Sequence, residues 1–346
     1  SDISVKVLEI EKLGDEHRIR SFFEEAIPQG AIENGVIVRK DLVAEAIKKA
    51  VRSARPKRIN TRKAVCSLPE SKAFLRIISI PDIKEEEAGE AVKWEIEASI
   101  PLSVDQVYFD WQFIDKPLAE NKENSKKDVL TVAVAKEVVD EWMGVFSSAG
   151  LDVQALELES VATARGLIKK DVSLEEVSLI VDLGAKRTSF IITEGNIPFF
   201  TSSIPFSSEN LTDAISKYLN ISLKEAERLK ITQGLSGPDG DDVVFKAVGP
   251  SLDFLIGEIE KTIDFYSNMD KGNKNITRVI LCGGGANLKG MVPYLAKKID
   301  KDFEEGDPWL NLNFSGNLPP ISKEESTGYA TVVGLAIRSL EDGNQT

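Results

Sequence analysis

The chain is poor in the residues that build most nucleophilic and zinc sites. Its 346 residues include two cysteines, Cys66 and Cys282, and one histidine, His17. The cysteines lie far apart and neither has a C-x-x-C partner, so zinc clusters and Ser-His or Cys-His catalysis are excluded. So few cysteines fit a reducing cytoplasm.

The sequence has fewer basic than acidic residues, and it has no long apolar run. Lys and Arg number 43 against 56 Asp and Glu, a net charge of -13. This field repels nucleic acid and acidic membranes, so a bound anion needs a local cradle. No apolar run reaches the roughly 18 residues of a spanning helix. We therefore expect no nucleic-acid partner and no direct membrane insertion.

The composition is that of a folded α/β protein. With 42% apolar and 29% charged residues, the chain can bury a core, and its length predicts two domains. In the first half, residues 70–135 form a small α+β unit with a helix over 84–99. The pattern also predicts strands at 5–10, 19–27, 31–38, 64–68, 74–80, 107–114, 129–135 and 151–158, and helices at 41–55, which Asp41 caps, and 136–149.

The second half repeats the order of strands followed by helices, which indicates two similar halves. Two strands flank Asp182, and a buried strand ends at Cys282. The remaining helices are predicted at 209–219, 222–230, 250–267 and 328–340, the second with a Ser222/Glu225 capping box.

Three short segments of this half are candidates for chemistry. The Asp182-Leu183-Gly184 turn leaves a buried strand, so its backbone N–H groups can hold an anion and its carboxylate a hydrated Mg²⁺. The second candidate, Gly283-Gly284-Gly285, lets a nucleoside or phosphate approach the main chain, although no Rossmann or P-loop pattern is present. The third candidate is the pair Glu227 and Lys230, which lie three residues apart on one helix face and can hydrogen-bond ribose hydroxyls. Taken alone, the first segment is also explained as an ordinary hairpin turn, the second as a strand-to-helix connection and the third as a surface ion pair.

The helix over 84–99 has two apolar stripes on opposite faces. Val92 and Ile96 are expected to face the small sheet, which leaves Ala91, Trp94 and Ala98 to be covered by the first domain or by a visiting peptide. Trp94 is therefore either a peptide anchor in a partly open groove or interdomain core.

Together these segments resemble the type IV pilus assembly protein PilM family, relatives of FtsA in the actin-like ATPase superfamily. Asp182 to Ser189 is similar to the family's second phosphate loop, Glu225 to Lys230 to its ribose-binding helix, and Gly283 to Gly290 to its adenosine motif. Ile80-Pro81, followed by Val92 to Glu97 and then Ile100-Pro101, resembles the PilM-type extra subdomain. Ser1 to Lys6 resembles the tail of the first phosphate loop.

The resemblance implies an α/β, two-domain actin-like ATPase fold with an inserted small α+β subdomain. The parts expected are 1–69 and 136–175 for the first domain, 70–135 for the insert, 176–320 for the second domain, and 321–346 for a returning helix. ATP and Mg are the implied cofactors. Phosphate would contact Lys6, Asp182, Gly184, Ala185, Arg187 and Thr188; the nucleoside Glu227, Lys230, Gly283, Gly284, Gly285 and Asn287; and the metal Asp182.

The implied function is a cytoplasmic scaffold of type IV pilus assembly, held at the inner face of the membrane by its partners. It would recruit the N-terminal peptide of a PilN-type membrane protein, with Trp94 as the contact, and self-association is compatible with this role. We expect ATP binding with weak or absent hydrolysis and no catalytic side chain. The alternatives are an FtsA-like polymer-forming protein, against which the polar end of the chain speaks, and a sugar or acetate kinase, for which residues 1–80 offer no catalytic carboxylate.

Overall fold

Two units make up the protein, for which a computed structural model describes residues 1–114, 126–235, 243–269, 274–315 and 319–342. The first unit comprises Ser1–Lys12, Ile19–Ala162 and Leu335–Thr346, and the second comprises Leu13–Arg18 and Thr163–Gly334. Each unit combines sheets and helices, as the sequence pattern predicted.

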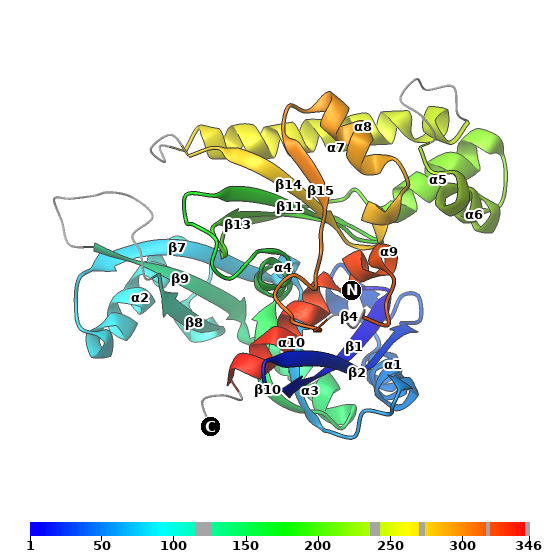
Figure 1. Ribbon diagram of the computed structural model, residues 1–346. Coiled ribbons are helices and arrows are strands. Elements are labelled where there is room, and N and C mark those ends of the chain that lie inside the picture. Colours follow the sequence, from blue (N-terminus) through cyan, green and yellow to red (C-terminus); the bar gives the residue numbers. More distant parts are fainter. Residues whose placement is uncertain (115–125, 236–242, 270–273, 316–318, 343–346) are drawn as a thin grey trace. The chain divides into compact units, whose positions relative to one another are not determined.

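The second unit is built on a five-stranded sheet, ordered β13-β12-β11-β14-β15 (Figure 1). β11, β12 and β13 form an antiparallel meander, whereas β14 and β15 run parallel to β11. The strands are β11 (Val177–Leu183), β12 (Thr188–Glu194), β13 (Ile197–Ile204), β14 (Ile276–Cys282) and β15 (Asp302–Glu305). β11 and β14 are apolar on both faces because helices cover both sides.

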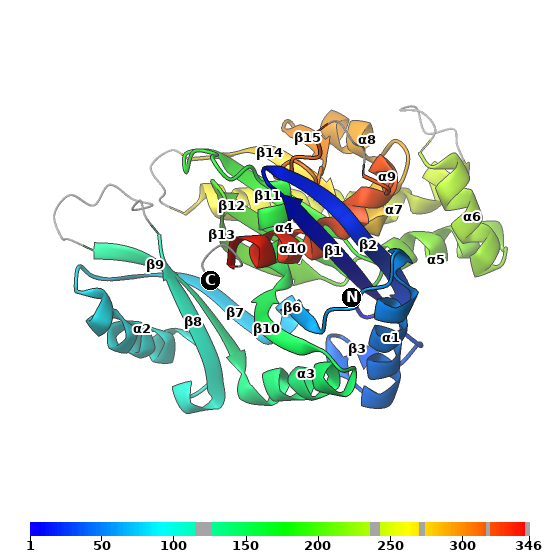
Figure 2. The same cartoon turned by 60° about the horizontal axis from the view of Figure 1, so that its bottom comes forward.

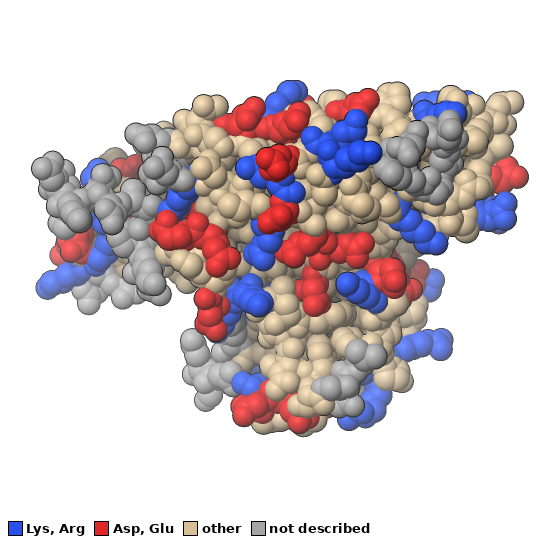
Figure 3. Space-filling model, turned by 45° about the horizontal axis from the view of Figure 1, so that its top comes forward, with Lys and Arg blue, Asp and Glu red and all other residues tan. Residues whose placement is uncertain are grey.

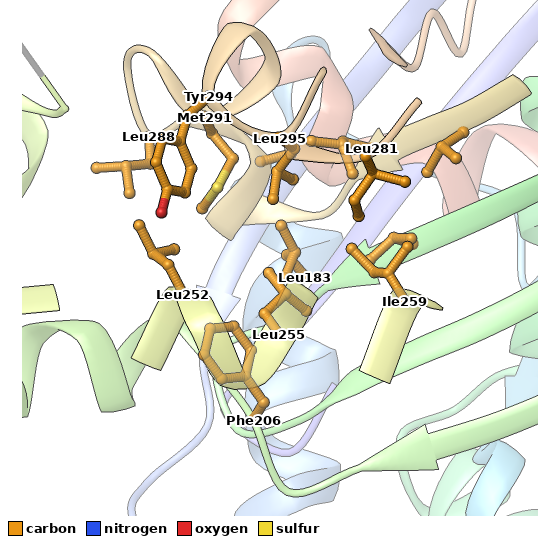
Figure 4. Close-up of a cluster of buried hydrophobic side chains, with 14 of the residues drawn as sticks. Leu183, Phe206, Leu252, Leu255, Ile259, Leu281, Leu288, Met291, Tyr294 and Leu295 are labelled. Atoms are coloured by element: carbon orange, nitrogen blue, oxygen red, sulfur yellow. The ribbon is translucent and has the colours of Figure 1, made fainter. Parts of the chain in front are cut away.

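One face of this sheet packs against a long helix. The helices of this unit are the end of α4 (Glu159–Leu167), α5 (Ser208–Leu219), α6 (Leu223–Gln233), α7 (Val243–Ser267), α8 (Met291–Lys298), α9 (Lys323–Ser326) and the start of α10 (Ala330–Asp342). Figure 4 shows Leu252, Leu255 and Ile259 of α7 among the side chains of Leu183 and Leu281 from the sheet. This cluster is the core of the second unit.

The predicted start of α7 at Pro250 is wrong, because the helix begins at Val243. Val244, Ala247 and Val248 are buried and extend the apolar stripe ahead of the proline. Burial of these side chains outweighs the cost of a proline inside the helix.

The other face of the sheet is covered by α4 and α10. Ala164 and Leu167 of α4 join Ile180 and Ile280 of the strands in a second buried cluster. An added Cβ on Gly166 would lie 2.6 Å from the carbonyl oxygen of Ala330. The predicted small-residue helix is therefore present, starting at Ala330, and its close packing on α4 requires glycine.

The first unit holds several small sheets (Figure 2). Its strands are β1 (Ser4–Leu13), β2 (Glu16–Ala26), β3 (Ile32–Glu33), β4 (Val36–Ile37), β5 (Arg55–Pro56), β6 (Lys63–Leu68), β7 (Ala73–Pro81), β8 (Val107–Phe113), β9 (Lys126–Ala135) and β10 (Asp152–Leu158). Its helices are α1 (Lys40–Ser53), α2 (Glu85–Ser99) and α3 (Lys136–Ser148).

Two local expectations for this unit are corrected. Asp41 does not cap α1: the N-cap is Arg39, and Asp41 lies in the first turn, where its charge suits the helix dipole. The strand predicted at 31–38 is a hairpin of two short strands, because Asn34 and Gly35 have positive φ angles that turn the chain.

The inserted α+β unit consists of α2 and the sheet β7-β9-β8. Val92 and Ile96 of α2 are buried against this sheet, as predicted. Ala91, which was predicted on the opposite stripe, also packs against this cluster. The outer face of α2 is therefore narrower than the sequence indicated.

Candidate functional site

The candidate site of the second unit forms where β11 and β14 end side by side. In their parallel register Asp182 lies opposite Cys282, so the two predicted glycine segments leave the sheet at the same edge. Ligands of open α/β sheets bind at the carboxyl ends of the strands. The register therefore brings together two motifs that are about 100 residues apart in the sequence.

The glycines here allow the main chains to touch. Gly283 has φ +80°, and an added Cβ would collide with Oδ1 of Asp182 and lie 2.7 Å from the carbonyl oxygen of Leu183. A Cβ on Gly285 would lie 2.9 Å from Leu183. Gly284, in contrast, has nothing within 4 Å of an added Cβ. Two of the glycines thus serve packing, and the middle one borders open space.

The turn after β11 is fixed by backbone hydrogen bonds. The N–H of Gly184 donates to the carbonyls of Asp182 and Arg187, and the N–H groups of Ser208 and Glu209, at the start of α5, donate to Gly184 and Ala185. Within the part of the chain that the structure describes, the N–H groups of Ala185 and Lys186 donate to no acceptor. The turn therefore keeps its carbonyls occupied and its amides available to an anion.

Arg187 and Thr188 have different surroundings at this turn. The Nε–H of Arg187 is buried without an acceptor among the described residues. Thr188 is fully buried, and its hydroxyl donates to the carbonyl of Phe206 over 2.9 Å. Thr188 therefore anchors the turn, whereas Arg187 has an unsatisfied donor that an anion would satisfy.

Glu227 and Lys230 are more than a surface pair. Lys230 is 6% exposed, and its Nζ donates to the Ser208 carbonyl, the Ser208 hydroxyl and the Thr212 hydroxyl at 2.8–3.1 Å. The same nitrogen lies 2.8 Å from Oε2 of Glu227. The ammonium group ties α6 to α5, while the Glu227 side chain remains 46% exposed.

Glu227 is held in its charged form. Partial burial raises the pKa of this carboxyl, but hydrogen bonds from Lys230 and Thr212 and the charge of Lys230 outweigh that effect, so its pKa lies below the ordinary value. Cys282 shows the opposite behaviour, because burial and then the charge of Asp182 raise the pKa of its thiol. A thiolate nucleophile is therefore disfavoured at this edge.

Thr327 is a contact that the sequence analysis missed. Its carbonyl accepts a 3.0 Å hydrogen bond from the N–H of Gly283, and its hydroxyl lies 2.7 Å from Oδ1 of Asn287. The residue follows a capping box formed by Ser322 and Glu325. That S-x-x-E spacing is a sequence signal for the start of a helix, here α9, which ends directly before Thr327.

Lys6 belongs to the first unit. Its Nζ lies 3.0 Å from Oε1 of Glu24 across the β1–β2 pair. Burial raises the pKa of Glu24, but Lys6 and a hydrogen bond from Ser4 lower it more strongly. The lysine therefore lies on a strand in an ion pair, and its phosphate contact stays a prediction.

Trp94 is a large apolar side chain on the surface of α2. Its side chain is 70% exposed, so within the first unit it is not part of a core. Ala98, one turn along the same stripe, is exposed as well. Trp94 is thus a prominent apolar surface residue, and its role in peptide binding stays a prediction.

Two further observations concern other candidate sites. No group of three or more His, Cys, Asp or Glu side chains in the described ranges could hold a metal. A cavity of about 420 Å³ is lined by Lys169, Lys170, Glu176 and Arg278, among others. Glu176 and Arg278 lie at the starts of β11 and β14, so this cavity is at the opposite end of the strands from the glycines.

Comparison with known proteins gives one family. Residues 1–340 match the family of type IV pilus assembly protein PilM. Among solved structures, the PilM-PilN type IV pilus biogenesis complex is 25% identical with a TM-score of 0.81, covering 98% of this chain and 96% of that chain.

More distant structures share the fold alone. Ethanolamine utilization protein EutJ from Carboxydothermus hydrogenoformans is 12% identical with a TM-score of 0.53, covering 96% of this chain and 89% of that chain. MreB5 of Spiroplasma citri bound to ADP is 13% identical with a TM-score of 0.53, covering 99% of both chains. Together with the PilM-PilN complex, these likenesses show a two-domain actin-like fold.

Proposed function

This chain belongs to the type IV pilus assembly protein PilM family, and we propose that it is a scaffold that binds ATP and Mg²⁺ and recruits a PilN-type membrane protein. The observation that carries the nucleotide part is the junction of Asp182, the amide-lined turn and the open Gly284 at one sheet edge. The partner follows from the similarity to the PilM-PilN complex.

The turn from Gly184 to Arg187 fits phosphate. The amides of Ala185 and Lys186 have no acceptor in the described structure, and neither has the buried Nε–H of Arg187. A phosphate oxygen would satisfy these donors, and such charge-assisted bonds are stronger than neutral ones. We assign Thr188 a supporting role, since its hydroxyl is buried and already bonded.

Asp182 fits a magnesium ion held mainly through water. Mg²⁺ keeps several waters and often takes only one or two carboxylates together with the phosphates. Asp182, at the end of β11, can supply one such carboxylate. When bound, the metal would neutralise phosphate charge, and Asp182 would hold it beside Gly283.

The nucleoside would contact Glu227 and the middle glycine. Glu227 is charged and half exposed, so its carboxylate can accept hydrogen bonds from ribose hydroxyls. Lys230 has its three protons committed to α5 and Glu227, so we assign it the task of positioning Glu227. Gly284 leaves room for a flat ligand, and Asn287 is held near it by Thr327.

In this proposal the nucleotide organises the protein and is not turned over at a useful rate. Besides Asp182, the turn has the Glu209 carboxylate beside it, which is paired with Lys186, and burial keeps the Cys282 thiol neutral. Activation of water would then depend on positioning and on the metal alone. Slow or absent hydrolysis fits a scaffold.

We further propose that Trp94 anchors the N-terminal peptide of the PilN-type partner. A tryptophan at 70% exposure presents a large apolar area that binding would desolvate. No helix of the residues described is long and apolar enough to cross a membrane. In this proposal the partner attaches the protein at the cytoplasmic face of the membrane, as the similarity to the PilM-PilN complex suggests.

Titration calorimetry with ATP and Mg²⁺ tests the nucleotide site. Gly284→Val should fold normally yet lose affinity by at least about tenfold, since the added side chain fills the open space. Asp182→Ala should lose the magnesium dependence of binding. The matched control is Gly144→Val, because Gly144 of α3 also has nothing within 4 Å. Normal Mg²⁺-dependent ATP binding by both site variants would sink the proposal.

A synthetic PilN-type N-terminal peptide tests the partner. Trp94→Ala should abolish its binding, whereas Tyr218→Ala, an exposed aromatic of the second unit, should leave it unchanged. Equal affinities in the two variants would refute the assignment of Trp94 and leave the nucleotide site unaffected.

A further inference from the structure

Residues 48–63, here called the basic segment, concentrate positive charge in an acidic protein. Between Glu45 and Glu70 there is no Asp or Glu, although the whole chain carries a net charge of -13. The segment contains eight basic residues, namely Lys48, Lys49, Arg52, Arg55, Lys57, Arg58, Arg62 and Lys63. It runs from the end of α1 through β5 to the start of β6 (Figure 2).

Most of this charge is not neutralised within the first unit. Lys48 lies 3.8 Å from Glu45, and Lys49 lies 2.8 Å from Glu25. The other six basic side chains make no ion pair with the described residues. All six of these basic residues are exposed to solvent. Figure 3 shows the contrasting pattern on the face that it draws, where Lys and Arg are interspersed with Asp and Glu.

The backbone beneath these side chains is tethered to neighbouring strands. Ser21 of β2 donates its hydroxyl to the carbonyl of Lys57 over 2.6 Å. The N–H of Asp152, at the start of β10, donates to the carbonyl of Arg62 over 2.7 Å. The basic side chains are therefore carried by a fixed strip of main chain, which lowers the entropy lost when they bind a partner.

We propose that the basic segment binds anionic lipid headgroups at a membrane surface. Clusters of four to eight Lys and Arg attract anionic lipids through the surface potential. Single-stranded nucleic acid is the poorer fit, because its binding uses stacking on aromatic side chains and residues 46–69 contain no Phe, Tyr or Trp. The choice of lipid among polyanions rests on the proposed function, which places the chain beside a membrane partner.

Three acidic residues adjoin the ends of the segment. Glu45 and Glu25 are paired with Lys48 and Lys49, and Asp152 lies opposite Lys63 in the β10–β6 register. The run from Arg55 to Arg58, which carries three basic residues around Pro56, pairs instead with Ser21 and Phe22 of β2. This run is therefore the centre of the proposed contact.

Vesicle flotation tests the proposal without nucleotide or peptide. The protein should float with vesicles of phosphatidylcholine and phosphatidylglycerol, but not with phosphatidylcholine alone, and salt should release it. Lys57→Glu combined with Arg58→Glu should weaken binding at least about twentyfold, since each Lys or Arg near the surface contributes roughly fivefold.

The matched control reverses two exposed lysines of the second unit. Lys297→Glu combined with Lys298→Glu changes the net charge equally and should leave vesicle binding unchanged. Equal loss in both double variants, or binding to a nucleic acid but not to vesicles, would overturn the proposal, as would absence of binding to either. Peptide titration on the same samples separates this result from a failure of the proposed function.

Discussion

The two units present their candidate binding groups in opposite ways. In the second unit the groups belong largely to the main chain: amides of the turn at 184–187 and glycines at the end of β14. In the first unit they are exposed side chains, such as Trp94 on α2. A substitution that alters the main chain at the glycines should disturb the fold, whereas truncation of an exposed side chain should not. Measured free energies of unfolding can therefore distinguish the two kinds of site.

The largest effect is expected between neighbouring glycines. Gly283→Ala should lower the free energy of unfolding by about 3 kcal/mol or more, because the residue has φ +80° and its Cβ meets Asp182 and Leu183. Gly284→Ala is the control and should change it by less than about 0.5 kcal/mol. Denaturant unfolding of both variants gives the comparison. Equal destabilisation would contradict the contacts described for Gly283.

A similar contrast holds on α2. Val92→Ala should cost about 2 kcal/mol, because Val92 is fully buried against the small sheet. Trp94→Ala, two residues along, should cost less than about 0.5 kcal/mol despite removing a larger side chain. Thermal melting measures both. A large loss of stability in Trp94→Ala would place this side chain in a core.

Lys230→Met tests whether a buried ammonium supports the exposed Glu227. The variant leaves the Ser208 and Thr212 oxygens without their donor, so we expect a loss of about 1–2 kcal/mol. ATP affinity should fall as well, because Glu227 loses the group that orients it. Unchanged stability together with weakened ATP binding would instead make Lys230 a direct ligand.

The smallest effect concerns acid pH. The pKa of Glu227 is lower in the folded state than its ordinary value of about 4.5, so the folded state binds fewer protons in that range. Its stabilisation is present above that value and is lost as pH falls through the folded-state pKa. Glu227→Gln should therefore be less stable than the wild type near neutral pH, and this difference should shrink in acid. Urea unfolding at several pH values measures it, and a constant difference would argue against the lowered pKa.

Much of the fold follows from local sequence signals. The apolar runs that became β11 and β14, the capping box of α6 and the glycine after α3 were all sufficient to predict elements that the structure contains. β13 escaped prediction because Pro198 interrupts its pattern, which is tolerated since β13 is an edge strand. α4 is short and contains Gly166, so its helix depends on packing against α10.

The site was predictable in its parts but not in its assembly. Asp182 and the three glycines carry turn and close-approach signals of their own, and the family resemblance supplied their order. The burial of Lys230 could not be predicted from the sequence. A glutamate followed three residues later by a lysine is equally typical of an ion pair on an exposed helix face. Thr327 contacts Gly283 across 44 residues of sequence, and no local pattern encodes such a contact.

The parallel pairing of β11 with β14 also sets when the site can form during synthesis. Asp182 leaves the ribosome about 100 residues before Gly283, and Thr327 follows later still. Because domains fold as their chain becomes available, the first unit has nearly its whole sequence before the second unit can close its sheet. A nascent chain that ends before β14 would thus leave the apolar edge of β11 unpaired, and one that ends before Thr327 would lack the hydrogen bond that Thr327 accepts from Gly283. The proposed nucleotide site would therefore be completed late in synthesis.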